Sequence, residues 1–219
     1  CAENIATLTI REEILEDVAE AIKFLKTNCT PLCSKQVLPI FILGHSLGAS
    51  VPHHVMKFIH EERPELTANV AGYIMLAGAS RPLYDLMEDQ YNYFYKLAKD
   101  AQDSAHLAEV EKVRIETINA IAKLRDALKL PKGSEDVERE MHVFASLKYW
   151  RHYGAASYDA VFETSDQFRV YLNSLCQKHL TNVKMLVVHG ARDYQVTMKD
   201  FEGWKQALNG MNNVEYKLY

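Results

Sequence analysis

The sequence predicts an α/β fold, in which a mostly parallel sheet is flanked by helices and carries a helical insertion. The first observation is the order of an apolar strand, a helix and a second apolar strand within residues 37–76. Two strands joined by a crossover helix are typical of a parallel sheet. The second observation is that about a hundred residues, 81–180, carry helical patterns without a convincing strand, and two further strands follow them.

Composition and charge narrow the class of protein. The 219 residues suffice for one large domain, or for one domain with an insertion. Apolar residues make up 48% of the chain, and the mean hydropathy is −0.22, which is typical of a globular protein. The net charge is −4 and no basic cluster occurs, so nucleic acid is not expected as a partner. No apolar run reaches the length of about eighteen residues that indicates a membrane span.

Cysteines and histidines predict neither a disulfide framework nor a metal site. Cys29 and Cys33 flank a Thr-Pro turn and could pair in an oxidising compartment, but scattered thiols are the favoured interpretation. His53 and His54 are neighbours, so they point to different faces of a helix and make a poor metal pair. These residues therefore predict no metal site.

The first part of the sheet core is expected within residues 1–80. Thr9 and Glu12 form a T-x-x-E capping box at the start of a helix over residues 10–27. Apolar residues recur along that helix at helical spacing: Ile10, Ile14, Val18, Ile22 and Leu25. Strands are predicted at 37–43 and 70–76, and the first is apolar on both faces, as a buried parallel strand is.

A helical cap insertion is expected over residues 81–180. Apolar residues at helical spacing predict its helices, around 83–97, 107–128, 137–147 and 166–179. Several aromatic residues of the cap could line a substrate pocket, although packing within the cap is the favoured role for each one singly. These residues are Tyr91, Tyr93, Phe94, Tyr95, Tyr149, Trp150 and Tyr153.

The second part of the core is expected over residues 181–219. Strands are predicted at 183–188 and 214–218. Between them, Thr197 or Asp200 could begin a helix that ends at Asn209-Gly210, because glycine is common just after a helix C-terminus.

A strand-to-helix turn with a serine at its tip is predicted where the sequence reads G-H-S-L-G. The apolar strand before it and a plausible helix over 51–59 after it fit the G-x-S-x-G nucleophile elbow. A Cβ on Gly44 or Gly48 is expected to press on the neighbouring strand or helix. The hydroxyl of Ser46 would then point out of the sheet, and the Leu47 N–H would face developing negative charge. An ordinary tight turn is the alternative interpretation.

These segments resemble an α/β-hydrolase, and more closely the bacterial dienelactone-hydrolase-like and prolyl-oligopeptidase-like esterases. The resemblance rests on G-H-S-L-G at 44–48, on G-A-S-R-P at 78–82 and on H-G-A-R-D-Y-Q-V at 189–196. It covers most of residues 9–80 and 181–219, and it covers the cap only loosely.

The resemblance implies a serine hydrolase that cleaves small carboxylic esters through an acyl-enzyme intermediate, without a cofactor. Ser46 would be the nucleophile, Leu47 N–H half of the oxyanion hole, and Asp193 the acid of the triad. A loop aspartate that caps the following turn is the alternative for Asp193. Asp85 is a rival acid, although a place at the start of a cap helix is favoured for it. A peptidase or amidase of the same fold, and a non-catalytic binding module, stay open as alternatives.

Two parts of the family pattern have no counterpart in this sequence. Family triads place the histidine after the last strand, and no histidine follows His189. The second oxyanion N–H comes from a loop upstream of residue 1. The histidines present are not expected to act as the base: His45, beside the serine, and His53, His54, His106, His142, His152 and His189. Because strand 37–43 would also have an unpaired apolar edge, we expect the natural protein to continue beyond both ends of this sequence.

Overall fold

A computed structural model describes most of the chain. The described residues are 10–29, 39–102, 104–127, 129–130, 134–136, 139 and 165–219. The chain divides into two compact units. The sheet unit contains residues 9–80 and 169–219, and the helical unit contains residues 1–8 and 81–168.

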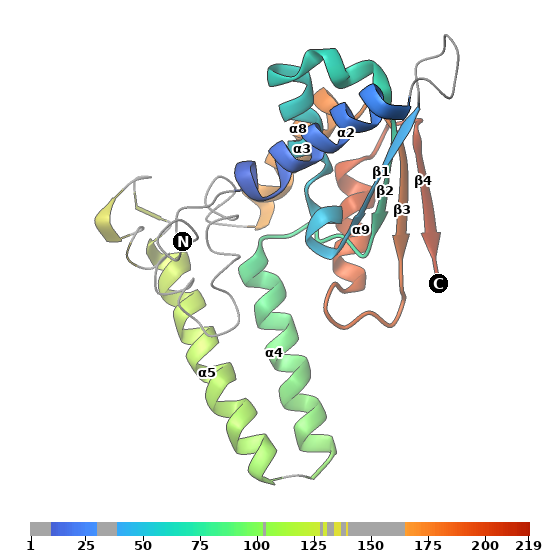
Figure 1. The fold of residues 1–219 in the computed structure, drawn as a ribbon. Helices are drawn as coiled ribbons and strands as arrows, with labels where there is room; N and C mark the ends of the chain where they lie inside the picture. Colours follow the sequence, from blue (N-terminus) through green and yellow to red (C-terminus); the bar gives the residue numbers. More distant parts are fainter. Residues whose placement is uncertain are drawn as a thin grey trace. The chain divides into compact units, whose positions relative to one another are not determined.

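Four parallel strands form the sheet of the sheet unit, in the order β1-β2-β3-β4 (Figure 1). They are β1 (Ile40–His45), β2 (Val70–Leu76), β3 (Lys184–His189) and β4 (Val214–Leu218). Every neighbouring pair is parallel, so the carboxyl ends of all four strands meet at one edge of the sheet. The prediction of an α/β fold with a mostly parallel sheet is therefore confirmed.

β1 ends two residues later than the strand predicted over 37–43. Its ladder with β2 continues until Gly44 pairs with Met75 and His45 pairs with Leu76. Residues 37 and 38 lie outside the described residues. β1 therefore leads directly into Ser46.

β1 is an edge strand of the described sheet, and it is only partly buried. Phe41 and Leu43 expose 55% and 60% of their surface. The prediction that this strand is buried on both faces is therefore wrong for the described part of the chain. β2 lies between β1 and β3, and its Tyr73 and Met75 are buried. An apolar sequence does not distinguish these two environments, because burial depends on what lies beside the strand.

Helices flank the sheet and turn apolar residues inward. They are α2 (Glu16–Cys29), α3 (Pro52–Glu62), α8 (Ser165–His179) and α9 (Met198–Ala207), with the short helices η1 (Arg11–Leu15), η3 (Ser46–Ser50) and η4 (Pro64–Asn69). The helix predicted over 10–27 is present, but η1 is a wider π-helical turn. Thr9 of the predicted capping box lies outside the described residues. Buried side chains on these helices include Ala19, Ile22, Val55, Met56, Ile59, Leu172, Phe201 and Trp204.

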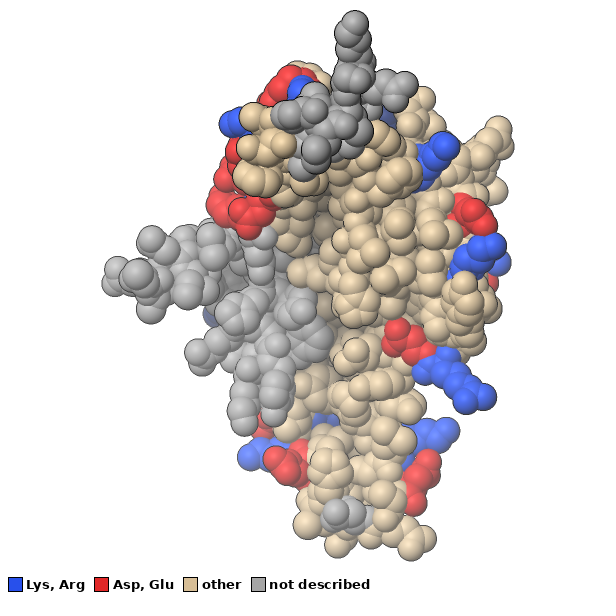
Figure 2. Space-filling view, turned by 45° about the vertical axis from the view of Figure 1, so that its right-hand side comes forward, with Lys and Arg blue, Asp and Glu red and all other residues tan. Residues whose placement is uncertain are grey.

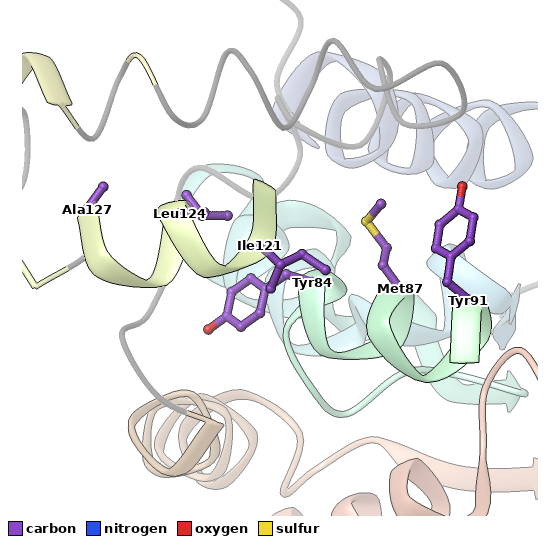
Figure 3. Packing of buried hydrophobic residues seen from close by; sticks show 6 residues of the cluster. All are labelled: Tyr84, Met87, Tyr91, Ile121, Leu124 and Ala127. Atoms are coloured by element: carbon purple, nitrogen blue, oxygen red, sulfur yellow. The ribbon is translucent and has the colours of Figure 1, made fainter. Parts of the chain in front are cut away.

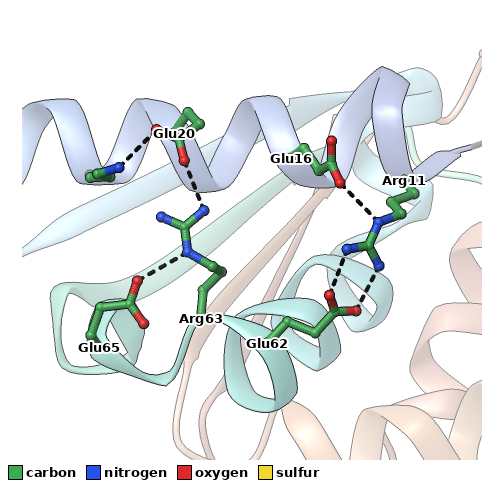
Figure 4. Close-up of polar contacts among 7 residues, drawn as sticks. Arg11, Glu16, Glu20, Glu62, Arg63 and Glu65 are labelled. Carbon is green, nitrogen blue, oxygen red and sulfur yellow. Dashed lines mark hydrogen bonds and ion pairs between the residues drawn. The ribbon is translucent and has the colours of Figure 1, made fainter.

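Two arginines join η1 and α2 to the end of α3 (Figure 4). Arg11 donates two hydrogen bonds to the carboxylate of Glu62, at 2.8 and 2.6 Å. Arg63 donates to Glu20 at 2.9 Å and to Glu65 at 3.0 Å. Exposed ion pairs contribute little individually, and the two-pronged contact of Arg11 links η1 to the end of α3.

Two histidines meet where α3 packs against α8. The Nδ1 atoms of His60 and His179 lie 3.2 Å apart, so one ring donates a hydrogen bond and the other accepts it. Burial lowers the pKa of both imidazoles below the ordinary value of 6.5. The positive charges of Lys178 and Lys57 lower the pKa of His179 further, whereas the charge of Glu61 raises it.

Acidification below about pH 6.5 should therefore destabilise the sheet unit. The pKa of His60 and His179 is lower in the folded chain than in the unfolded chain, so the unfolded chain takes up protons first as the pH falls. The stability that the pair provides is complete above about pH 6.5 and is lost as the pH falls through the folded-state pKa values. Urea unfolding at about pH 7.5 and about pH 5.5 measures this loss.

The change His60→Gln should make the free energy of unfolding less dependent on pH in this range. The same change at His106, which is exposed on another helix, should leave the dependence as it is. If the free energy of unfolding of His60→Gln depends on pH as in the wild type, the histidine pair does not couple protonation to folding.

The helical unit contains a hairpin of α4 (Leu83–Asp100) and α5 (Ser104–Ala127), which run side by side (Figure 1). The helices meet in a buried apolar cluster, formed by Tyr84, Met87, Tyr91, Ile121, Leu124 and Ala127 (Figure 3). Arg125 binds Asp85 at 2.6 Å and Glu88 at 2.8 Å. The helices predicted over 83–97, 107–128 and 166–179 are confirmed. The helix predicted over 137–147 lies largely outside the described residues.

Charged side chains of both signs share the face of the molecule drawn in Figure 2. Exposed ion pairs of the chain include Lys205 with Glu202 at 3.1 Å and Lys217 with Glu215 at 2.7 Å. Such pairs are screened by water and salt and contribute little to folding. Within the described residues, no helix is long and apolar enough to cross a membrane.

Candidate functional site

Ser46 stands at the strand-to-helix turn in a strained backbone conformation. It follows the last residue of β1, is exposed, and has a φ of +53°. A residue other than glycine in this left-handed region costs about 1–2 kcal/mol, and such residues cluster at functional sites. η3 begins at Ser46, and α3 follows with Pro52 at its start, where a missing N–H does no harm. The strand, turn and helix are those that the G-x-S-x-G pattern predicts.

In this elbow, backbone atoms crowd around Gly44 but not around Gly48. A Cβ on Gly44 would overlap the carbonyl group of Gly48 and would lie 2.7 Å from the backbone nitrogen of Ala49. A Cβ on Gly48 would meet no described atom within 4 Å. The prediction is therefore right for Gly44 and wrong for Gly48, because the turn folds back over the first glycine only.

Leu47 and His45 flank the serine. Leu47 lies in the first turn of η3, where backbone N–H groups have no partner within the helix. An N–H in this place can donate to an oxygen that carries developing negative charge beside Ser46. The residue His45 is exposed and ends β1 with an extended backbone.

Hydrogen bonds from β2 and from the chain after it hold the elbow. The Tyr73 hydroxyl donates to the carbonyl of Gly48 at 2.7 Å. The Ser50 hydroxyl donates to the carbonyl of Ser46 at 2.9 Å and accepts from the N–H of Ala79 at 2.7 Å. Burial raises the pKa of the Tyr73 phenol, which keeps its proton on the oxygen. Sequence reasoning missed these residues, although the place of Ser50 one helical turn after Ser46 could have indicated its contact.

Asp193 lies in the loop after β3, with one oxygen bound and one open. Its Oδ1 accepts the N–H of Gln195 at 2.9 Å and that of Val196 at 3.1 Å. Among the described residues, none donates to Oδ2. The carboxylate therefore caps its own loop, as the alternative interpretation expects, and still has an oxygen for a second partner.

The elbow and the acid loop share one edge of the sheet. Ser46 follows β1 and Asp193 follows β3, and β2 lies between these parallel strands. Two strand spacings correspond to about 10 Å. The two predicted site residues thus come from different strands but lie at the same carboxyl edge.

His189 and His53 are held in the interior of the sheet unit. The Nε2 of His189 donates to the carbonyl of Val196 at 2.8 Å, and the ring of Phe201 lies 5.6 Å away. His53 lies 6.3 Å from the ring of Trp204, and burial lowers its pKa well below the ordinary range. These contacts of His189 agree with the structural role that the sequence favours for it. Two histidines lie outside the described residues, His142 and His152.

Asp85 and Tyr91 have partners within the helical unit, whereas Tyr93 is exposed. Asp85 lies in the first turn of α4 and binds Arg125. Tyr91 is buried, and the edge of its ring meets that of Phe94 with ring centres 6.2 Å apart. Three aromatic residues lie outside the described residues: Tyr149, Trp150 and Tyr153.

Metal ligands do not gather in the part of the chain that the structure describes. No group of three or more His, Cys, Asp or Glu side chains there could hold a metal ion. Cys176 is free and buried, and burial raises the pKa of its thiol to about 12, which makes it a poor nucleophile.

The four parallel strands confirm the predicted α/β fold. The left-handed serine after β1 and the aspartate loop after β3 lie where the resemblance to α/β-hydrolases leads one to expect the nucleophile and the acid.

A comparison with known proteins adds one similar sequence. The chain is 32% identical over 213 residues to Esterase EstD of Thermotoga maritima. The match covers 97% of this chain and 40% of that protein, so the chain spans less than half of its relative. No protein-family model matches the chain.

Solved structures give weaker similarities. One is the serine hydrolase CCSP0084 of Cycloclasticus zankles, with 14% identity and a TM-score of 0.36 over 92% of this chain and 63% of that one. Another is the Saccharomyces cerevisiae carboxypeptidase Kex1, with 10% identity and a TM-score of 0.43 over 90% of this chain and 53% of that one. At such scores the fold assignment rests on the strand order and the elbow instead. The finer resemblance to dienelactone-hydrolase-like and prolyl-oligopeptidase-like esterases stays a prediction.

Proposed function

We propose that the protein is a serine hydrolase that cleaves small carboxylic esters. The observation that carries this proposal is the left-handed Ser46 at an exposed strand-to-helix turn. The similarity to an esterase along 97% of this chain supports an ester as the substrate. Because the chain spans only 40% of that relative, the activity of the whole protein belongs to the proposal.

In the proposed reaction, the Ser46 oxygen attacks the ester carbonyl while a histidine takes the hydroxyl proton. The N–H of Leu47 stabilises the negative oxygen of the tetrahedral intermediate. The histidine then gives its proton to the leaving alcohol, and an acyl group stays on Ser46. Water, deprotonated by the same histidine, releases the acid and restores the serine.

Asp193 would orient that histidine. Its Oδ1 is fixed by the two backbone N–H groups of its own loop, so the carboxylate has a defined direction. The open Oδ2 can accept a hydrogen bond from one ring nitrogen of the histidine. This contact would hold the tautomer whose other nitrogen faces Ser46, and it would stabilise the ring when it becomes charged.

The end of β4 supports a place for the histidine after the last strand. The N–H of Ala191 donates to the carbonyl of Tyr219 at 2.6 Å, and the N–H of Tyr219 donates to the carbonyl of His189 at 3.0 Å. The chain at Tyr219 therefore lies beside the acid loop. A histidine that follows β4 in the natural protein would start within reach of Asp193.

Two other functions use the same fold. A peptidase or amidase would share the elbow and differ in its leaving group. A binding module would keep the fold and lack an activated serine. The similarity to an esterase favours the ester over the amide.

A fluorophosphonate should label Ser46 of the intact protein at a single site. Intact mass should show one adduct, and the adduct should disappear in Ser46→Ala and persist in Ser174→Ala, a change at an exposed serine of α8. The labelled wild type should lose its activity toward p-nitrophenyl esters. Absence of labelling in the folded wild type would favour the binding module, and anilides cleaved as fast as esters would favour the amidase.

A further inference from the structure

A short segment after β2 is bonded to both the elbow and the chain that carries the acid loop. We call Ala77–Ser80 the bridge segment. The N–H of Ala79 donates to the hydroxyl of Ser50, which in turn donates to the carbonyl of Ser46. The N–H of the next residue, Ser80, donates to Oδ1 of Asp200 at 3.1 Å. Two consecutive backbone N–H groups therefore point to the two halves of the candidate site.

Packing leaves the bridge segment little freedom to shift. A Cβ on Gly78 would overlap the carbonyl group of Ala49 in the elbow. From the other side, the indole nitrogen of the fully buried Trp204 donates to the carbonyl of Gly78 at 2.9 Å. The segment is therefore confined between η3 and α9.

Asp200 connects the bridge segment to the acid loop. Its carboxylate is fully buried, with Oδ1 on the N–H of Ser80 and Oδ2 on the N–H of Thr197 at 3.2 Å. Thr197 and Asp200 also form the capping box that starts α9. The residue before Thr197 is Val196, whose N–H holds Asp193. The two carboxyl oxygens of Asp200 therefore link the bridge segment to the start of α9.

We propose that Asp200 is a positioning residue, which sets the separation of Ser46 and Asp193 through the bridge segment. The inference rests on the proposed hydrolase function of these two residues. The connection runs from the elbow through Ser50 and the bridge segment to Asp200, and from there through the acid loop to Asp193.

The change Asp200→Asn keeps the shape of the side chain and removes one of the two acceptors. An amide NH₂ group would then face a backbone N–H, so one hydrogen bond is lost and two donors oppose each other. The acid loop should shift relative to the elbow. A misplacement of about 1 Å can lower the rate about 100-fold, so we expect kcat to fall about 10- to 100-fold with KM within about twofold.

The pH profile separates positioning from a loss of folded protein. If Asp193 moves away from the histidine, it stabilises the charged ring less, and the pKa of the histidine falls. The acidic limb of the plot of kcat/KM against pH should therefore shift to lower pH in Asp200→Asn. A smaller folded fraction would lower the rate without moving this limb.

The experiment compares the intact wild type with Asp200→Asn and Glu202→Gln. The second variant removes a charge from the same helix at an exposed residue whose bonds, among the described residues, go to Lys205. Rates are expressed per active site counted with a fluorophosphonate. Hydrogen exchange of the Gln195 and Val196 amides, which bind Asp193, should become about tenfold faster in Asp200→Asn and stay as in the wild type in Glu202→Gln.

The outcomes distinguish this inference from the proposed function. A labelled, active wild type together with an Asp200→Asn variant of unchanged rate, pH profile and amide exchange overturns the positioning role and leaves the hydrolase intact. An unlabelled wild type overturns the hydrolase and, with it, any catalytic role of Asp200. A slower rate with a shifted acidic limb and faster exchange supports the proposal.

Discussion

Replacing Asp193 with asparagine should lower the kcat of the intact protein about 10⁴-fold. Under the proposed mechanism, the amide can no longer hold the histidine in the tautomer that removes the Ser46 proton, and it does not stabilise the charged ring. One oxygen remains available to accept the N–H groups of Gln195 and Val196, so the loop should keep its shape and KM should change little. Steady-state kinetics with a p-nitrophenyl ester measures the change.

Asp17→Asn is the matched control for this variant. Asp17 is exposed in the first turn of α2, and its change should leave kcat as in the wild type. An Asp193→Asn enzyme with more than about a tenth of the wild-type kcat would show that another group orients the histidine.

Replacing Gly44 with alanine should destabilise the protein by about 3 kcal/mol or more. The added Cβ would overlap the carbonyl group of Gly48, and neither backbone can move without opening the elbow. Any folded fraction should also react more slowly with a fluorophosphonate, because Ser46 would be displaced. Urea unfolding and the labelling rate measure the two effects.

Gly48→Ala is the paired variant within the same motif. A Cβ there meets no described atom within 4 Å, so this change should be neutral or should stabilise the protein by about 0.4–1 kcal/mol. Equal losses in Gly44→Ala and Gly48→Ala would mean that the motif is crowded at both glycines, contrary to the observed turn.

The fold was largely predictable because local patterns determine it. The apolar run at 70–76 and the alternating apolar residues at 214–218 became β2 and β4 with the predicted bounds. The helices of the hairpin in the helical unit followed from apolar residues at helical spacing. The prediction that the first strand is buried on both faces was wrong, since Phe41 and Leu43 are exposed. An apolar strand has the same sequence at an edge as in the interior.

Of the candidate site, the sequence motif predicted only the serine and its turn. G-H-S-L-G identified Ser46 and its turn, because few other residue orders permit that backbone. Asp193 was proposed from resemblance, and its two loop contacts could not be read from the sequence. The junction at Asp200 was missed for a physical reason. Ser80 and Asp200 are 120 residues apart, and a helix-start aspartate looks the same whether or not a distant N–H binds it.

The left-handed serine limits how this protein can become more heat-resistant. Glycine at position 46 would remove about 1–2 kcal/mol of backbone strain and, under the proposed mechanism, the nucleophile with it. The free energy of unfolding of a natural protein is only about 5–15 kcal/mol, so the backbone strain at this one residue is an appreciable fraction of it. Selection for thermostability and selection for chemistry oppose each other at this turn. Gains in melting temperature are therefore to be sought elsewhere, such as at Gly48, where the backbone has room and no left-handed residue is required.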